Sequence, residues 1–205
     1  MLDVMAAVLP PVSWQRMENA VQKVRERLLR AADALKTAGI PYAVVGGNAV
    51  AAWVSRVDEA AVRNTRDVDI LLRRTDFEAI QTALAAAGFV HRNVASLGQG
   101  GSMDVFLDGP QAKVRDAVHV LWANESVKPG IEDLSPDVTQ SEDAGEFQLI
   151  SLGALLRMKL SAWRDKDRMH LRDLIDVGLI DAALENGLPS ALKARLESLA
   201  DGEGS

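Results

Sequence analysis

Hydrophobic residues at helical spacing dominate the first part of the chain. An apolar residue recurs every three or four positions at Met17, Val21, Val24, Leu28, Ala32 and Leu35. This pattern predicts a long helix with one apolar face. Ser13 stands where an N-cap is expected, Gly39 suits the position just past the helix end, and Pro41 prevents continuation. Shorter helices are predicted over residues 48–55 and 75–87.

Short runs between these helices have the composition or alternation of β-strands. They are residues 42–47, a run that stops at two glycines, and residues 67–72, 89–95, 103–108 and 117–123. Glycine-rich turns separate the last three runs, which favours an antiparallel extension of the sheet.

The second half of the chain changes character. Residues 125–146 are rich in Glu, Asp, Ser and Pro and indicate a surface crossing with little regular structure, while 149–187 and 189–199 have helical patterns. We therefore expect an α+β fold, with a mixed sheet and flanking helices over residues 1–124. The crossing and a C-terminal helical lobe would follow over residues 125–205.

Two aspartates interrupt a strand that otherwise has the pattern of a buried one. In "RDVDILL", Val68, Ile70 and Leu72 share one face, whereas Asp67 and Asp69 share the other with Leu71. Carboxylates two residues apart on one strand face lie about 7 Å apart, and they repel unless water or a cation lies between them. The pair therefore indicates a metal site.

A glycine pair precedes this strand by one short helix. Gly46 and Gly47 leave backbone N–H groups uncovered at a helix start, where the helix dipole helps to bind phosphate. A phosphate site beside a carboxylate pair is what a nucleoside triphosphate with Mg²⁺ requires. The order of these features therefore indicates nucleotide chemistry.

Composition limits the kinds of site and the cellular compartment that fit this chain. The 205 residues are 48% hydrophobic, enough for one ordinary core, and include no cysteine, which excludes disulfides and cysteine-based catalysis or zinc binding. We therefore expect a cytoplasmic location. The net charge of −6 argues against a surface built generally for nucleic acid. An acid at position 3 and a Pro10-Pro11 pair predict neither a signal peptide nor a membrane span at the start of the chain.

The stretch "VVGGNAVAAW…RNTRDVDILL" resembles the core motif of DNA polymerase beta-like nucleotidyltransferases, in the branch that contains AbiEii-type toxins. In that branch a glycine pair and a short helix precede the pattern R-x-T-x-D-h-D. The matching positions are Arg63, Thr65, Asp67 and Asp69. Further on, "KLSAWRDKDRMHLRDL" is similar to the helical motif of the branch, in which a lysine precedes R-x-K-D-x-x-D-L. The matching positions are Lys159, Arg164, Lys166 and Asp167.

The resemblance implies a nucleotidyltransferase-like fold and a set of site residues. Asp67 and Asp69 would bind Mg²⁺ or Mn²⁺ and act in catalysis. The nucleotide would be bound by Gly46, Gly47, Asn48, Arg63, Thr65, Arg66, Lys159, Arg164, Lys166 and Asp167. For Lys159 the residues add an argument, because a lysine within the apolar stretch "LGALLRMKL" needs an anion such as a triphosphate.

Two departures from the family pattern concern activity. The second aspartate of the helical motif falls on His170, with Asp173 one turn further on. The third catalytic carboxylate falls on a later strand, where Asp104 and His119 both occupy polar positions and either could be the general base.

The function implied by the resemblance is transfer of a nucleoside monophosphate from a nucleoside triphosphate to a hydroxyl group. An RNA end is the favoured acceptor, a protein is another, and the enzyme would be part of a toxin–antitoxin or phage-defence pair with a cognate antitoxin. The alternative is a protein with this fold that binds a nucleotide or a partner without turnover, and the histidines at two carboxylate positions motivate it.

Overall fold

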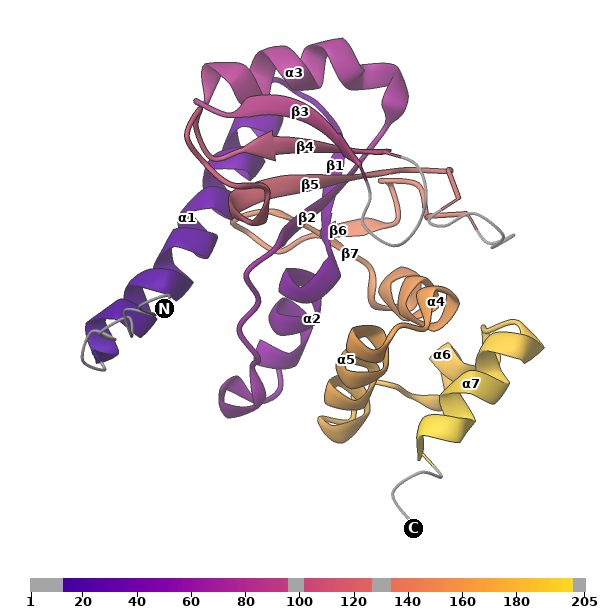
Figure 1. Cartoon of the computed structure of the whole chain (residues 1–205). Helices are drawn as coiled ribbons and strands as arrows, with labels where there is room; N and C mark the ends of the chain where they lie inside the picture. The colour runs from indigo at the N-terminus through magenta and orange to yellow at the C-terminus, as the bar shows by residue number, and fades with distance from the viewer. Residues whose placement is uncertain (1–12, 96–101, 127–133, 201–205) are drawn as a thin grey trace, which may run out of the picture.

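The computed structural model describes residues 13–95, 102–126 and 134–200, and the expectations for the first residues lie outside these ranges. The elements follow one another as α1 (Trp14–Thr37), β1 (Tyr42–Val45), α2 (Gly46–Ser55), β2 (Val68–Leu72), α3 (Phe77–Ala86), β3 (Val90–Ala95), β4 (Ser102–Leu107), β5 (Ala117–Trp122), β6 (Ser141–Asp143), β7 (Gln148–Ile150), α4 (Leu152–Ala162), α5 (Asp165–Asp176), α6 (Ala182–Asn186) and α7 (Ser190–Ala200). Figure 1 shows their arrangement.

The seven strands form one mixed sheet in the order β3-β4-β5-β2-β1-β7-β6. β5 runs parallel to β2, while β4 is antiparallel to both β3 and β5. The expected antiparallel extension is therefore confirmed, as is the α+β class with a mixed sheet and flanking helices.

Helices cover both faces of the central strands. α1 and α3 pack Leu35 and Ile80 against Ile70 on one face, whereas α2, α4 and α5 pack against Leu71 on the other. Because neighbouring residues of β2 serve two different cores, the strand is polar only at Asp67 and Asp69, where it enters the sheet. The two aspartates therefore lie at one end of a strand that is otherwise enclosed.

The expected crossing over residues 125–146 contains regular structure. β6 lies within it and pairs with β7, which runs parallel to β1, so this segment returns to the edge of the same sheet. The prediction of little regular structure is therefore wrong for residues 141–143.

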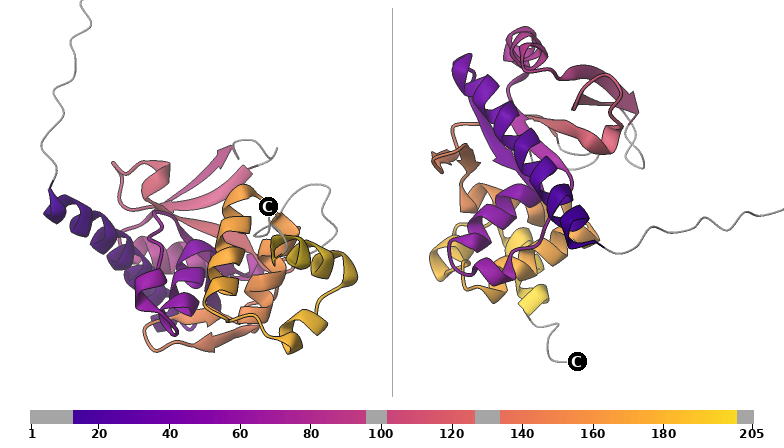
Figure 2. Two further views of the ribbon diagram at one scale, coloured as in Figure 1. Left: turned by 90° about the horizontal axis from the view of Figure 1, so that it is seen from below. Right: turned by 90° about the vertical axis from the view of Figure 1, so that its left-hand side faces the viewer.

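The predicted helix over 149–187 is also broken into separate elements. Leu149 and Ile150 belong to β7, and Ser151 caps α4 by accepting a hydrogen bond from the backbone N–H of Ala154. Trp163 then adopts a left-handed conformation with φ 50°, which ends α4. Figure 2 shows α4 to α7 gathered at one end of the molecule, and their leucines form a third apolar cluster.

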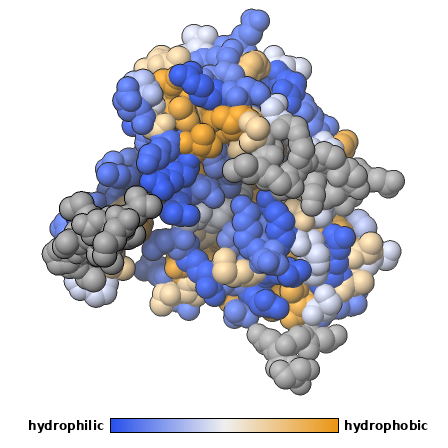
Figure 3. Space-filling model, in the orientation of Figure 1, coloured by the Kyte–Doolittle hydropathy of each residue, from blue (hydrophilic) through white to orange (hydrophobic). Residues whose placement is uncertain are grey.

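The surface is mostly hydrophilic on the face shown in Figure 3, with hydrophobic residues exposed over β3, β4 and β5. An apolar cluster of Val105, Leu107 and Ala117 lies in this part of the sheet. Within the described ranges, no helix has both the length and the hydrophobicity needed to cross a membrane.

Candidate active site

The turn from β1 into α2 brings the predicted phosphate site into contact with the aspartate strand. Gly46 has φ +68°, and a Cβ placed on it would lie 2.0 Å from Oδ2 of Asp69. A Cβ on Gly47 would lie 2.8 Å from Oγ1 of Thr65. No side chain caps the start of α2, so its first N–H groups are available to an anion. The glycine pair thus permits contacts that any side chain would prevent.

Alanine at Gly46 is expected to lower the free energy of unfolding by more than alanine at Gly39. Both glycines have φ +68°, so both substitutions incur about 1–2 kcal/mol of backbone strain. Only at Gly46 would the new methyl group also meet the Asp69 side chain. The Cβ of Asp69 would lie 2.8 Å from this methyl group, so rotation of the carboxylate alone cannot relieve the clash. We expect a further loss of about 1–3 kcal/mol, measured by urea unfolding. Equal losses would show that Asp69 moves freely.

Asp67 and Thr65 are held on the loop that leads into β2. The side-chain amide of Asn48 donates a 2.7 Å hydrogen bond to the backbone carbonyl of Asp67. Asn48 was predicted to bind nucleotide, but its amide group is used to fix the start of the aspartate strand. Asn48 therefore holds the backbone at Asp67, and its binding of nucleotide stays a prediction.

Asp69 lies beside His119 on the neighbouring parallel strand, where the two residues are in register. Nδ1 of His119 is 3.5 Å from Oδ1 of Asp69, and Nε2 is 3.2 Å from the backbone carbonyl of Val114. The Asp69 carboxylate raises the pKa of His119 above its ordinary value, against the opposing effect of burial, and Asp67 adds to the rise. The structure thus brings Asp67, Asp69 and His119 into one negatively charged group.

Asp104 lies on the opposite face of the sheet. Val105 pairs with His119 in the β4–β5 ladder, so Asp104 points away from the side that carries His119 and Asp69. Its carboxylate is buried and accepts hydrogen bonds from His91, Asn93 and Trp122 at 2.9, 3.0 and 3.2 Å. Although burial raises its pKa, these donors outweigh that effect and hold the pKa of Asp104 below its ordinary value. The prediction of Asp104 as a base beside Asp69 is therefore corrected.

Arg63 connects the aspartate loop to the helical lobe. Its Nε donates a 2.7 Å hydrogen bond to Oδ1 of Asp173 on α5, while 60% of the Arg63 side chain stays exposed. Arg66 is also exposed, and its side chain forms no hydrogen bond or ion pair with any part of the chain that the structure describes. The two arginines of the loop thus differ: one is anchored and the other is open to a ligand.

Lys159 already has an anion within the protein. Its ammonium lies 3.1 Å from Oδ1 of Asp167, which is fully buried and also binds Nε of Arg164 at 2.6 Å. Burial lowers the pKa of Lys159, and Asp167 offsets this only in part. The inference that Lys159 needs a triphosphate is therefore corrected, because Asp167 is the partner. Lys166, in contrast, is exposed and unpaired among the residues with described positions.

His170 occupies a half-buried position on α5 between Lys159 and Asp173. Its Nδ1 has no hydrogen-bond partner in the described part of the chain, and neither does Oδ2 of the buried Asp173. Burial and the nearby Lys159 charge lower the pKa of His170 to about 4. His170 is therefore neutral at neutral pH. Asp173, one turn further along α5, forms the ion pair with Arg63.

Stability is expected to fall below pH 6.5 in a way that depends on His170. The unfolded chain binds a proton on this histidine below about pH 6.5, whereas the folded chain does so only near a pKa of about 4. The free energy of unfolding should therefore decrease as pH drops through this window. Because the ring is partly exposed, we expect the wild type to lose about 1–2 kcal/mol more than His170→Gln between pH 7 and 4.5. Urea unfolding at both pH values measures this, and equal losses would refute it.

A divalent metal fits the carboxylate pair as an ion shared with substrate. Mg²⁺ is commonly held by one or two carboxylates together with phosphate oxygens and water. The Asp69 carboxylate lies against Gly46, the first residue of α2, where phosphate would lie. Among the described residues, no three His, Asp or Glu side chains are already gathered into an ion site. The two carboxylates therefore fit an ion whose remaining ligands would be phosphate oxygens and water.

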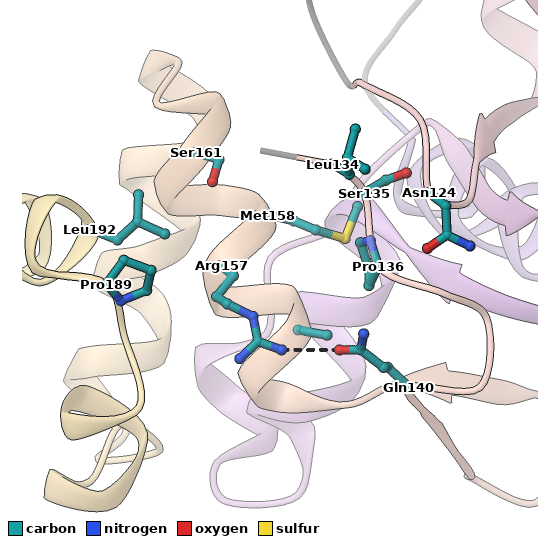
Figure 4. A pocket seen from close by; sticks show the side chains of 11 residues that line it. Asn124, Leu134, Ser135, Pro136, Gln140, Arg157, Met158, Ser161, Pro189 and Leu192 are labelled. Atoms are coloured by element: carbon teal, nitrogen blue, oxygen red, sulfur yellow. Dashed lines mark hydrogen bonds between the residues drawn. The ribbon is translucent and has the colours of Figure 1, made fainter. Parts of the chain in front are cut away.

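A separate cavity of about 190 Å³ lies beside α4 (Figure 4). Arg157 and Ser161 line it from one face of the helix, and Arg157 donates a 3.0 Å hydrogen bond to Gln140. Lys159 lies on a different face. None of the predicted site residues lines this cavity, so it is distinct from the candidate active site.

Comparisons with known proteins support the fold. No protein-family model matches the sequence, and no curated protein matches it. The solution structure of the antibiotic-resistance factor ANT(2'')-Ia has a TM-score of 0.51 and 15% identity, covering 91% of this chain and 95% of that one. The crystal structure of ANT(2'')-Ia in complex with adenylyl-2''-tobramycin has a TM-score of 0.50 and 17% identity, covering 86% and 97%. The chain therefore has the nucleotidyltransferase-like fold.

Proposed function

We propose that the protein transfers a nucleoside monophosphate from a nucleoside triphosphate to a hydroxyl acceptor, with Mg²⁺ or Mn²⁺ held at Asp67 and Asp69. The observation that supports this best is the contact of Asp69 with the Gly46 turn. A side chain as small as alanine at position 46 would collide with the carboxylate. The carboxylate pair and the uncapped start of α2 thus serve one ligand, a phosphate chain with its cation.

Different groups of the chain would contact different parts of this ligand. The first N–H groups of α2 bind the phosphates, and the exposed cations Arg66 and Lys166 are free to approach them. Arg63, anchored at Asp173, presents the rest of its guanidinium to solvent. A bound metal would neutralise charge that develops on the reacting phosphate.

The reaction is an in-line displacement. The acceptor hydroxyl oxygen attacks the α-phosphorus, the bond to the bridging oxygen breaks, pyrophosphate leaves, and the hydroxyl proton is lost to a base. Of the two residues considered for the third catalytic position, His119 is the one that stands beside Asp69.

The acceptor we propose first is an RNA end, as the resemblance to the AbiEii-type branch implies, with a cognate antitoxin as partner. A second acceptor class comes from the tobramycin adduct bound by ANT(2'')-Ia. An amino sugar is cationic, and the net charge of −6 attracts a cation while it repels RNA. These two acceptors therefore make opposite electrostatic demands.

The test is incubation with each α-labelled nucleoside triphosphate and Mg²⁺ or Mn²⁺, in separate reactions with total RNA, cell protein and tobramycin. We expect label to appear in one acceptor and unlabelled pyrophosphate to be released. Absence of transfer from every nucleotide to every acceptor would overturn the enzymatic proposal. Retained nucleotide binding in that case would support the non-catalytic function, which the histidine beside Asp69 favours.

A further inference from the structure

Two histidine–aspartate pairs lie on opposite faces of the sheet and differ in geometry. In the first, Nε2 of His91 lies 2.9 Å from Oδ1 of Asp104, a normal hydrogen-bond distance, and further donors complete the shell of that carboxylate. In the second, Nδ1 of His119 lies 3.5 Å from Oδ1 of Asp69. This distance is at the outer limit for a hydrogen bond, and no other side chain in the described ranges donates to Asp69, so we call the first pair closed and the second open.

The other ring nitrogen of His119 is fixed by the backbone. Nε2 lies 3.2 Å from the carbonyl oxygen of Val114, which can only accept, so Nε2 carries the proton. In the neutral ring the lone pair is then on Nδ1 and faces Asp69. A histidine that ligates a metal typically donates its second ring N–H to such a carbonyl, which orients the ring.

The spacing of the open pair suits two ligands of one ion. Two donor atoms about 2.1 Å from a shared metal lie about 3.0 Å apart at a right angle and about 3.4 Å apart near the tetrahedral angle. The 3.5 Å between Nδ1 of His119 and Oδ1 of Asp69 is close to the wider value. Asp67, on the same strand face as Asp69, adds negative charge that attracts a cation.

We propose that Asp69 and His119, supported by Asp67, form a mixed carboxylate–imidazole site that prefers divalent transition-metal ions such as Mn²⁺ over Mg²⁺. Imidazole nitrogen is a poor ligand for Mg²⁺ and a good one for transition metals, and affinity for a given site rises along that series from Mn²⁺. A ring nitrogen that binds the ion cannot also accept the acceptor's proton, so His119 is a ligand and not the general base. The use of the ion in nucleotide transfer rests on the proposed function, whereas its binding does not.

The experiment is a titration of the purified metal-free chain with Mn²⁺ alone, followed by electron paramagnetic resonance of free Mn²⁺, and repeated with Mg²⁺ as competitor. We expect His119→Gln to weaken Mn²⁺ binding at least about tenfold. We expect His119→Asp to lower the preference for Mn²⁺ over Mg²⁺ at least about tenfold, because it replaces nitrogen by oxygen. The matched control is His91→Gln, which alters the closed pair and should leave Mn²⁺ affinity unchanged. Circular dichroism checks that each variant is folded.

Mn²⁺ affinity that is the same in the wild type and in folded His119→Gln would overturn the proposal, as would absence of Mn²⁺ binding by the wild type. Because no nucleotide is present, the result is independent of turnover. If Mn²⁺ binding depends on His119 but no nucleotide is transferred, only the proposed function is refuted. If nucleotide is transferred but metal binding does not depend on His119, only the mixed site is refuted.

Discussion

Replacement of Asp67 and Asp69 together by asparagine is expected to lower the rate of nucleotide transfer at least about 10³-fold. The variant keeps the size and polarity of both side chains but removes the charges that we propose hold a cation beside the Gly46 turn, where Asp69 lies. Charge stabilisation by a catalytic metal contributes several kcal/mol, and each 1.36 kcal/mol changes the rate tenfold. The measurement is transfer of labelled nucleotide to whichever acceptor the wild type uses.

The control for this variant is Asp104→Asn. Asp104 is also a strand aspartate beside a histidine, but it lies on the other face within a closed set of hydrogen bonds. We expect its melting temperature to fall, because the buried donors around position 104 lose the charged acceptor that they face. The transfer rate of the folded protein should stay unchanged. Asp104→Asn inactivity at a temperature where the variant is folded would contradict the assignment of the site to the Asp69 face.

The double asparagine variant should also leave the fold intact. The two carboxylates repel each other, and their removal relieves that repulsion while the contact of Asp69 with His119 is lost. These effects oppose each other, so we expect the free energy of unfolding to change by less than about 1 kcal/mol. Collapse of the fold would instead show that the pair has a structural role.

The sequence was informative where the site depends on neighbouring residues. The glycine pair, the short helix and the alternating aspartates lie within one stretch of chain. Their order was therefore enough to predict that Gly46 and Asp69 serve the same site. The contact between them adds the reason for glycine, which is the missing Cβ.

The sequence could not decide between Asp104 and His119. Both occupy polar positions of alternating strands, and alternation alone does not say which face of the sheet a polar residue reaches. That face is set by pairing between distant segments, which places His119 opposite Asp69 and Val105 opposite His119. Which of the two residues lies beside Asp69 therefore became visible only with the strand register.

The helical lobe shows the same limit for buried charge. The apolar surroundings of Lys159 correctly indicated that it requires an anion, but several acids follow it in the sequence. The break at Trp163 turns α5 back so that Asp167 meets Lys159. A helix continued through this point, as the periodicity predicted, would not form the same pair. Local structure at one residue thus decided which anion the lysine receives.

Among the variants considered, Asp167→Ala is expected to lower the free energy of unfolding most. Its carboxylate is fully buried between Lys159 and Arg164, and it also accepts a hydrogen bond from the backbone N–H of Arg164 at the start of α5. Asp167→Ala leaves the Lys159 ammonium without its partner, on a side chain that is only 7% exposed. Breaking a buried ion pair from one side costs about 3–5 kcal/mol because an uncompensated charge remains. Urea unfolding at pH 7 measures the loss.

Two further variants separate this buried charge from ordinary loss of an acid at the start of a helix. Asp165→Ala removes a carboxylate from the same turn, where the side chain is 94% exposed and pairs with Arg168, so we expect a change of no more than about 0.5 kcal/mol. The double variant Lys159→Met with Asp167→Leu removes both buried charges and should recover most of the stability lost in Asp167→Ala, because apolar pairs often replace buried ion pairs at little cost. If Asp167→Ala lies within 1 kcal/mol of the wild type, Lys159 must reach solvent or lose its proton readily. If the double variant is no more stable than Asp167→Ala, the hydrogen bonds of Asp167 to Arg164 and the α5 backbone, rather than the Lys159 charge, account for the loss.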